Sequence, residues 1–401
     1  MRSTRRAGRM SFMLAAAVTA AATPLLASAQ EVGMRAGAST AAAMPAIASP
    51  AVTDGRVTFR LRAPEARAVM VSGDFGQDVA LTRGGDGVWT ATVGPLKPEV
   101  YVYYFTVDGV RLTDPANPQV KIGYVTTTTT SIVNVPGDAL AFHDVQDVPH
   151  GELRTLVYKS QSNKVTRELN VYLPPGYDAS QRQRYPVLYL LHGFANDHNS
   201  WHRYGRANEI LDNLLAARKI KPFIVVMPLG YGGAAVNGDG TGIAPASAGA
   251  FGSDFALYEQ DILKDIIPLI DGKYRTLANR DNRAIVGFSM GGMQAGRFGL
   301  GHLETFSHVG IMSAGLVGSP AAAAGPDPIA PLAANPAAAN KQLKLLWLAC
   351  GVDDTAMAGA RNTHLALEKA GIKHTFVESE GAHHWRVWRH YLNDLAPQLF
   401  R

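Results

Sequence analysis

The part of the chain after residue 50 carries a short-period pattern of apolar and polar residues. Between residues 51 and 136, stretches in which hydrophobic positions alternate with polar ones are separated by turn-forming pairs such as Asp54-Gly55 and Asp108-Gly109. A period of two is typical of strands with one buried face, and Asp-Gly is a common turn sequence. The pattern predicts a small β-sandwich of about 85 residues. Its expected strands are 56–61, 68–71, 88–93, 101–107 and 131–135.

Residues 151–401 carry a different pattern, in which hydrophobic runs alternate with amphipathic segments. The runs 185–191 and 223–228 are apolar at nearly every position, which is typical of strands that helices cover on both faces. Strands that alternate with helices predict a doubly wound, mainly parallel α/β sheet. Further strands are expected at 153–159, 167–173, 283–286, 309–313, 343–349 and 375–378, and helices at 208–218, 255–270 and from residue 290.

The remaining segments are identified by their composition. Four arginines precede the apolar, Ala-rich run 12–22, and a small-residue Ala-Ser-Ala sequence follows it, so residues 1–29 are predicted to be a secretory signal peptide. Residues 30–50 are expected to be a flexible leader, and residues 137–150 a linker between the two domains. Outside the signal peptide no apolar run is long enough to span a bilayer. We therefore expect a secreted or periplasmic protein without a membrane partner.

The net charge changes once the signal peptide is excluded. The chain of 401 residues has 38 Lys and Arg against 33 Asp and Glu, a formal charge of +5. Four of the arginines lie in the signal peptide, which leaves a charge of +1 on the mature chain. A near-neutral chain disfavours nucleic acid as a partner. The single cysteine, Cys350, ends an apolar run and is expected to be an inert core thiol.

The strongest chemical signal is the sequence Gly-Phe-Ser-Met-Gly-Gly at 287–292, which follows one expected strand and opens a helix. A sharp strand-to-helix turn projects a serine hydroxyl out of the sheet, and glycines are needed where a Cβ would clash. Ser289 is therefore the candidate nucleophile. The N–H groups of Met290 and of Phe194, after His192-Gly193, are the candidate oxyanion donors. His192 is expected to brace the second of these loops.

A serine nucleophile needs a histidine base and an acid that orients the histidine, and on this fold they follow the serine in the order acid, then base. His383 and His384 lie in the loop after the last expected strand, and the spacing does not choose between them. Asp353 and Asp354 follow the strand at 343–349. This pair is favoured over Glu378 and Glu380 as the source of the acid.

Other motifs give weaker alternatives. The Gly-rich segment 238–242 resembles a phosphate-binding loop but lacks a following helix and lysine, and a calcium-type loop starting at Asn237 has Ala248 in place of its Glu. No His-Glu-x-x-His is present to support a histidine metal site. The sequence thus predicts neither a metal nor an organic cofactor. The three histidines considered as ligands of a metal site are His192, His198 and His202. Aromatic residues that form either a sugar platform or sandwich core are Trp89, Tyr101, Tyr103 and Tyr104.

Six short motifs lie between residue 147 and the C-terminus. They are Asp147–Gly151, Val171–Tyr177, Leu188–Gly193, Gly287–Gly292, Cys350–Asp354 and Gly381–Trp388. Their residues and order resemble those of the esterase D-like α/β-hydrolases, and among these the feruloyl and acetyl-xylan esterases of carbohydrate esterase family one. Residues 54–135 more loosely resemble the immunoglobulin-like early-set modules related to glycogen-binding domains. The resemblance implies an α/β-hydrolase fold for residues 151–401 and an early-set module for residues 51–136.

The resemblance also selects among the candidate residues. It implies that Ser289 is the nucleophile, and that His383 is the base because Gly381-Ala382-His383-His384-Trp385 matches the family's Gly-Gly-His-x-Trp pattern. Asp354 is the implied acid because it ends a Cys-Gly-x-x-Asp run. Ala382 departs from the usual glycine. The aromatic wall beside the substrate is expected from Trp201 and Trp385. Two long insertions, at 230–252 and 318–340, have no family counterpart and follow strands where binding loops are expected.

The implied function is that of a secreted serine ester hydrolase that works through an acyl-enzyme. Its expected substrate is a small ester or a plant cell-wall polysaccharide, from which it removes feruloyl or acetyl groups. One alternative is a siderophore (tricatecholate) esterase, which should have a basic cleft that the near-neutral mature chain disfavours. The others are an acyltransferase and a non-catalytic glycan-binding protein on the same scaffold.

Overall fold

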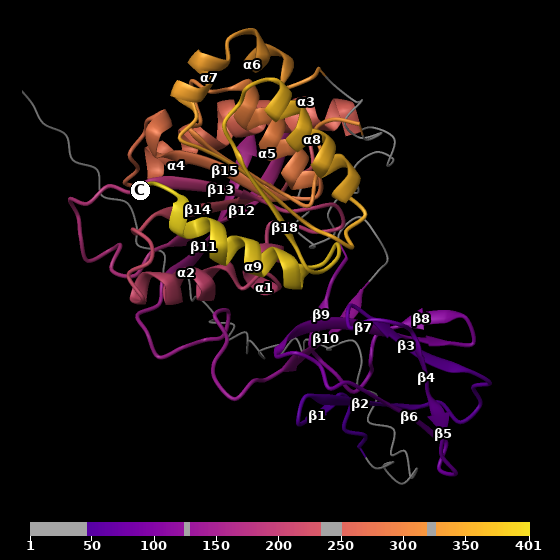
Figure 1. Cartoon of the computed structure of the whole chain (residues 1–401). Coiled ribbons are helices and arrows are strands. Elements are labelled where there is room, and N and C mark those ends of the chain that lie inside the picture. The colour runs from indigo at the N-terminus through magenta and orange to yellow at the C-terminus, as the bar shows by residue number, and fades with distance from the viewer. Residues whose placement is uncertain (1–45, 124–128, 234–250, 319–325) are drawn as a thin grey trace, which may run out of the picture. The chain divides into compact units, whose positions relative to one another are not determined.

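The computed structural model describes residues 46–123, 129–233, 251–318 and 326–401. The predicted signal peptide, most of the predicted leader and the segment considered above for phosphate or calcium lie outside these residues. Residues 46–401 form one compact unit that contains three β-sheets (Figure 1). Within the described ranges, no helix is long and apolar enough to cross a membrane.

Two antiparallel sheets form the β-sandwich. One has the strand order β1-β2-β6-β5, and the other has the order β4-β3-β7-β10-β9 with β8 paired to β7. Tyr101, Tyr103 and Trp89 are 1%, 0% and 8% exposed, so these three aromatic residues pack in the sandwich core and form no open platform. The strands are β1 (Ala51–Thr53), β2 (Arg56–Arg62), β3 (Val69–Gly73), β4 (Val79–Ala80), β5 (Thr82–Arg83), β6 (Val88–Val93), β7 (Glu99–Val107), β8 (Val110–Leu112), β9 (Val120–Lys121) and β10 (Thr130–Val135).

The third sheet has eight strands in the order β11-β12-β14-β13-β15-β16-β17-β18. β11 and β12 are antiparallel to each other, and β12 is antiparallel to β14, whereas the strands from β14 to β18 run parallel. The chain thus has an α/β-hydrolase fold preceded by a β-sandwich. The strands are β11 (Glu152–Ser160), β12 (Val165–Leu173), β13 (Val187–Leu191), β14 (Ile224–Pro228), β15 (Arg283–Phe288), β16 (His308–Met312), β17 (Leu345–Gly351) and β18 (Thr375–Ser379).

Helices cover both faces of this sheet (Figure 1). On one face, Leu211 of α2 and Leu392 of α9 join the sheet's side chains in one hydrophobic cluster. On the other face, Phe298 of α5 and Leu367 of α8 belong to a second cluster. Burial on both faces explains why the central strands are apolar at nearly every position. The helices are α1 (Ser200–Arg203), α2 (Ala207–Ala216), α3 (Phe251–Gln260), α4 (Ile267–Lys273), α5 (Met290–Gly301), α6 (Ala330–Ala334), α7 (Pro336–Gln342), α8 (Met357–Lys369) and α9 (Trp385–Leu395).

Arg389 of α9 connects the sandwich to the α/β sheet. Its side chain is 1% exposed and lies 2.8 Å from Glu99 Oε1 at the start of β7. The guanidinium also donates hydrogen bonds to the carbonyl oxygens of Val100 and Tyr204, both at 2.7 Å. A single planar cation therefore joins the sandwich strand β7, the turn after α1 and the helix α9.

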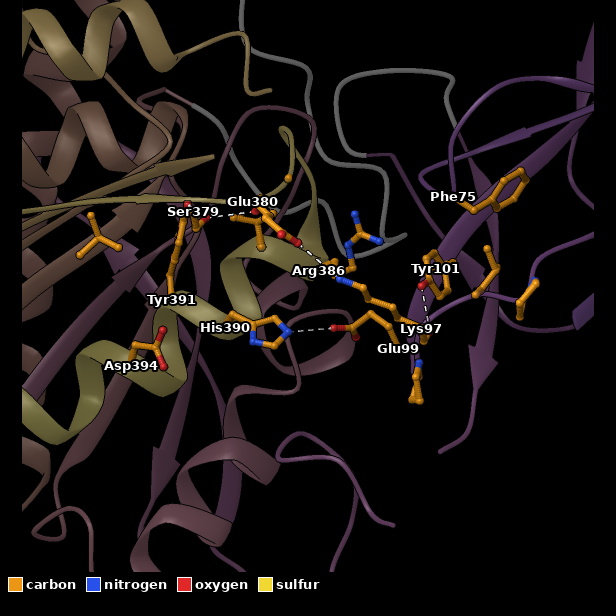
Figure 2. Close-up of a pocket in the computed structure, with 16 residues that line it drawn as sticks. Phe75, Lys97, Glu99, Tyr101, Ser379, Glu380, Arg386, His390, Tyr391 and Asp394 are labelled. Carbon is orange, nitrogen blue, oxygen red and sulfur yellow. Dashed lines mark hydrogen bonds and ion pairs between the residues drawn. The ribbon is translucent and has the colours of Figure 1, made fainter. Parts of the chain in front are cut away.

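Glu99 is surrounded by further basic side chains. His143 Nε2 lies 3.3 Å from Glu99 Oε1. On the other side, His390 Nε2 lies 3.5 Å from Glu99 Oε2 (Figure 2). Burial alone would raise the pKa of Glu99, but the hydrogen bond of His390 and the charges of Arg389 and His143 outweigh burial and lower the pKa to about 2. A carboxyl with a depressed pKa stabilises the fold above its unfolded value of 4.5, and this stabilisation is lost as the pH falls toward 2.

We expect Arg389→Met to lower the free energy of unfolding by about 3–5 kcal/mol, because the buried Glu99 carboxylate would lose its main partner. Urea denaturation at pH 7 measures the effect. Arg361→Met is the matched control, since Arg361 pairs with Glu378 on the surface and its removal should change stability much less. Equal effects of the two substitutions would contradict the role assigned to Arg389.

Candidate active site

Ser289 occupies a tight turn between β15 and α5. Its backbone has φ 54° and ψ −121°, a conformation that L-residues rarely adopt and that marks strain. A Cβ on Gly287 would lie 2.3 Å from the Gly291 carbonyl oxygen, and a Cβ on Gly291 would lie 2.5 Å from the His192 carbonyl oxygen. Only glycine fits at either position, so the glycines of the motif allow the turn that projects Ser289.

The structure brings together three side chains that are far apart in the sequence. His383 Nε2 lies 2.9 Å from Ser289 Oγ, and His383 Nδ1 lies 2.8 Å from Asp354 Oδ1. Asp354 follows β17 and is 5% exposed, and its Oδ1 also accepts a hydrogen bond from the Ala356 N–H at 2.7 Å. This chain of hydrogen bonds has the connectivity of a Ser-His-Asp triad.

The ionisation of Asp354 depends on His383. Burial alone would raise the pKa of this carboxyl, but the hydrogen bond and charge of His383 outweigh burial and hold the pKa below its usual value. The carboxylate is therefore charged at neutral pH and can accept the Nδ1–H of His383. That bond fixes the tautomer that leaves Nε2 free to accept the serine proton.

The other candidates from the sequence lie elsewhere. Asp353 is exposed, and His384 occupies the N-cap position of α9, with its ring 3.4 Å from Arg386. Glu378 pairs with Arg361, and Glu380 pairs with Lys97 on the surface. The geometry thus separates His383 from His384 and Asp354 from Asp353, which the spacing left open.

The two predicted oxyanion donors belong to residues that adjoin the serine turn. Met290 is the first residue of α5, so its N–H has no acceptor within the helix. Phe194 directly follows Gly193, where an added Cβ would lie 3.1 Å from Ser289 Cβ. The loop after β13 therefore packs against the serine turn, which places both predicted donor residues beside Ser289.

His192 braces the loop that carries Phe194. It is fully buried, and its Nδ1 lies 2.8 Å from the Gly193 carbonyl oxygen while its Nε2 accepts the Gly230 N–H at 2.8 Å. Burial lowers the pKa of His192 to about 4, so the ring stays neutral and can donate from one nitrogen and accept at the other. Gln294 of α5 donates to the Gly230 carbonyl at 2.8 Å, which ties the loop after β14 to the same helix.

Trp201 and Trp385 are packed in the interior and do not form an open aromatic wall. They are 1% and 4% exposed, and their rings contact each other edge-on at 5.2 Å. Phe288 and Trp388 complete the cluster and stack at 3.8 Å. Trp388, which was not among the predicted site residues, meets the His383 ring edge-on at 5.1 Å. The sequence feature that could have identified Trp388 is its position one helical turn after Trp385.

The described residues contain no group of three or more His, Cys, Asp or Glu side chains arranged to hold a metal ion. His198 instead lies 3.3 Å from Glu168, and His202 lies 3.3 Å from Asn199. Cys350 is buried, and burial is the main cause that raises the pKa of its thiol to about 12. The thiol therefore stays protonated, which is the expected behaviour of an inert core cysteine.

Comparison with known proteins identifies the family. A model of the Esterase family matches residues 160–399, more than half of the chain. The chain belongs to this family. Endo-1,4-beta-xylanase/feruloyl esterase of Xylanibacter ruminicola is 33% identical over 357 residues, which cover 87% of this chain and 45% of the relative. Endo-1,4-beta-xylanase Y of Acetivibrio thermocellus is 26% identical and matches 59% of this chain and 22% of its own. This Esterase-family chain thus spans less than half of either relative.

Solved structures of other esterases share the fold. The ferulic acid esterase of Anaeromyces mucronatus, from carbohydrate esterase family one, superposes with a TM-score of 0.54 at 22% identity and covers 65% of this chain and 93% of its own. The enterobactin esterase of Shigella flexneri has a TM-score of 0.64 at 18% identity and covers 86% of this chain and 93% of its own. At these identities, the likeness shows that this family member shares their fold.

We expect Gly287→Ala to lower the free energy of unfolding by about 1–3 kcal/mol, because the added methyl would overlap the Gly291 carbonyl oxygen. Gly301→Ala, at the other end of α5, is the control. Nothing lies within 4 Å of a Cβ there, and alanine favours a helix over glycine. Thermal denaturation of both variants provides the comparison, and a Gly287→Ala protein as stable as the wild type would show that the turn can relax.

Proposed function

We propose that this protein is a serine carboxylesterase that works through an acyl-enzyme on Ser289. The observation that carries the proposal is the hydrogen-bonded chain from Ser289 Oγ through His383 to Asp354, with links of 2.9 and 2.8 Å. Without a base a serine hydroxyl is a weak nucleophile, and a neutral imidazole at hydrogen-bond distance supplies that base. The buried carboxylate holds the imidazole in the required tautomer.

The proposed reaction has two stages. Ser289 Oγ attacks the ester carbonyl carbon while His383 Nε2 takes the hydroxyl proton, and the N–H groups of Met290 and Phe194 stabilise the oxyanion. When the intermediate collapses, His383 returns the proton to the leaving alcohol oxygen, and the acyl group stays on Ser289. A water molecule then attacks the acyl-enzyme with His383 again as the base, which releases the carboxylic acid and restores the serine.

For the substrate, we propose a feruloyl or acetyl ester of plant cell-wall polysaccharide. The support is the likeness to the Xylanibacter ruminicola protein named as an endo-1,4-beta-xylanase/feruloyl esterase, which extends over 87% of this chain. The predicted signal peptide fits a substrate met outside the cytoplasm. Secretion and the polysaccharide substrate belong to the proposal together.

A second candidate is hydrolysis of a siderophore triester. The observation that favours it is the likeness to the enterobactin esterase of Shigella flexneri, which at 86% of this chain extends well beyond the α/β sheet into the sandwich. Its 18% identity establishes a shared fold only. The charge of +1 on the predicted mature chain gives no excess of basic residues for a polyanionic ligand.

Ser289→Ala should lower kcat/KM for 4-nitrophenyl acetate by at least about four orders of magnitude, since the variant lacks the nucleophile. Ser379→Ala removes a serine hydroxyl that bonds Tyr391 at 2.7 Å and should keep the wild-type rate. The assay is the release of 4-nitrophenolate by the purified protein. Activity retained in Ser289→Ala would remove Ser289 from the mechanism.

Asp354→Asn should lower kcat by about 10⁴-fold, because an amide that donates to the imidazole favours the wrong tautomer. Asp353→Asn is the neighbouring control and should leave kcat near the wild-type value, since Asp353 is exposed. Steady-state kinetics on the same ester test both. If Asp353→Asn were the inactive variant, the acid would be misassigned.

The substrate class is tested with methyl ferulate, acetylated xylan and a catecholate triester, assayed on the mature protein. We expect the highest kcat/KM on one of the first two, and product analysis with an added sugar acceptor should show free acid in excess of transferred ester. Preference for the catecholate triester would favour the siderophore esterase. Dominant transfer to the sugar would indicate an acyltransferase.

A further inference from the structure

The two carboxylate oxygens of Asp354 have different surroundings. Oδ1 accepts from His383 and from the Ala356 N–H. Oδ2 is buried, and among the described residues it has no hydrogen-bond partner. An ionised oxygen without a donor in the interior is costly. A further donor to Oδ2 is therefore expected close by.

Ser313 has a buried hydroxyl and is hydrogen-bonded through its backbone to β17, the strand that leads to Asp354. It directly follows β16, and its side chain is 1% exposed. Its Oγ accepts the indole N–H of Trp388 at 2.9 Å. A hydroxyl that accepts from Trp388 still has its own hydrogen to donate, and the Asp354 carboxylate is a candidate acceptor. The Ser313 hydroxyl is also among the groups that hold the pKa of Asp354 down.

The backbone around Ser313 connects it to the catalytic elements. Its N–H donates to the Ala349 carbonyl of β17 at 2.8 Å, and the preceding carbonyl of Met312 accepts the Ser289 N–H at 2.9 Å. Ser313 has φ 48°, a left-handed conformation that is unfavourable for most residues other than glycine. The strand end that anchors Ser289 thus also presents Ser313 toward the strand that leads to Asp354.

We infer that Ser313 is a positioning residue for Asp354: held by the Trp388 indole, its hydroxyl donates to Oδ2 and fixes the carboxylate opposite His383. This inference rests on the proposed serine mechanism. Trp388 contributes twice, since its N–H orients Ser313 and its ring lies edge-on to His383. Acid and base are thereby located by the same side chain of α9.

The test compares Ser313→Ala with wild type on 4-nitrophenyl acetate across pH 5 to 9. A hydrogen bond to a charged group contributes enough that we expect kcat to fall by about 10- to 100-fold with little change in KM. A carboxylate with one donor fewer binds a proton on the Asp354–His383 pair more tightly. The acid limb of the kcat/KM profile should therefore move to higher pH.

Two further variants keep the test informative if Ser313→Ala is unstable. Ser313→Gly removes the hydroxyl at a backbone conformation that suits glycine and should show the same loss and shift. Trp388→Phe keeps a ring but removes the N–H and should move the acid limb in the same direction. Ser379→Ala, with its hydroxyl on Tyr391, is the control and should leave the profile unchanged.

Wild-type kcat in folded Ser313→Gly would overturn the inference, and so would a lower kcat with an unmoved acid limb, which would indicate a packing role alone. These outcomes are distinct from failure of the proposed function. If Ser289→Ala kept its activity, the serine mechanism would fail whatever Ser313 did. If substitution of Ser289 abolished activity and substitution of Ser313 had no effect, only the positioning role of Ser313 would be wrong.

Discussion

The site depends on the parallel arrangement of strands in the eight-stranded sheet. Residues at the ends of β15, β17 and β18 lie at one edge because these strands run in the same direction, with Gly287 paired to Leu191 of β13 and Gly351 paired to Ser379. Ser289, Asp354 and His383 each follow one of these strand ends. The parallel sheet brings the three residues to the same edge, and the loops that follow the strands orient their side chains.

An aromatic cluster beneath this edge of the sheet orients the catalytic side chains. Phe288 comes directly before Ser289 and stacks on Trp388, whose ring meets the imidazole of His383. The cluster fills the space behind the histidine with apolar surface, where hydrogen bonds between charged groups are stronger than in water. The charge on Asp354 is tolerated there because His383 and the Ala356 N–H compensate it. Packing and electrostatics therefore act on the same few residues.

Sequence patterns predicted the parts of the fold that one physical constraint determines. The fully apolar runs appear as β13 and β14 within two residues of their expected bounds, because burial on both faces leaves no polar positions. The serine turn was predictable because steric overlap excludes every residue but glycine. Short sandwich strands such as β4 and β9 have only two residues each, too few for any periodicity. The expected helix at 255–270 is interrupted by a π-helical segment, Asp261–Ile266, which the hydrophobic spacing does not reveal.

The directions of side chains also could not be predicted from the pattern of hydrophobic and polar residues. His383 and His384 are neighbours in one loop, yet His383 hydrogen-bonds Ser289 whereas the His384 ring lies 3.4 Å from Arg386. Trp201 was a candidate for the substrate wall, yet its indole N–H donates to the Leu191 carbonyl inside the core. The spacing of residues in the sequence does not determine whether a tryptophan side chain is buried in the core or faces the substrate. The role of Ser313 was likewise hidden, since it depends on strands that meet only in the folded sheet.

The most direct test of the central claim is mass spectrometry of the protein after reaction with a 4-nitrophenyl alkylphosphonate, which mimics the tetrahedral intermediate and stays bonded to the nucleophile. The account predicts one adduct, on the peptide that contains Ser289, and little or no adduct when His383 is replaced by alanine. An adduct on another residue, or an active enzyme that the phosphonate neither labels nor inhibits, would contradict it.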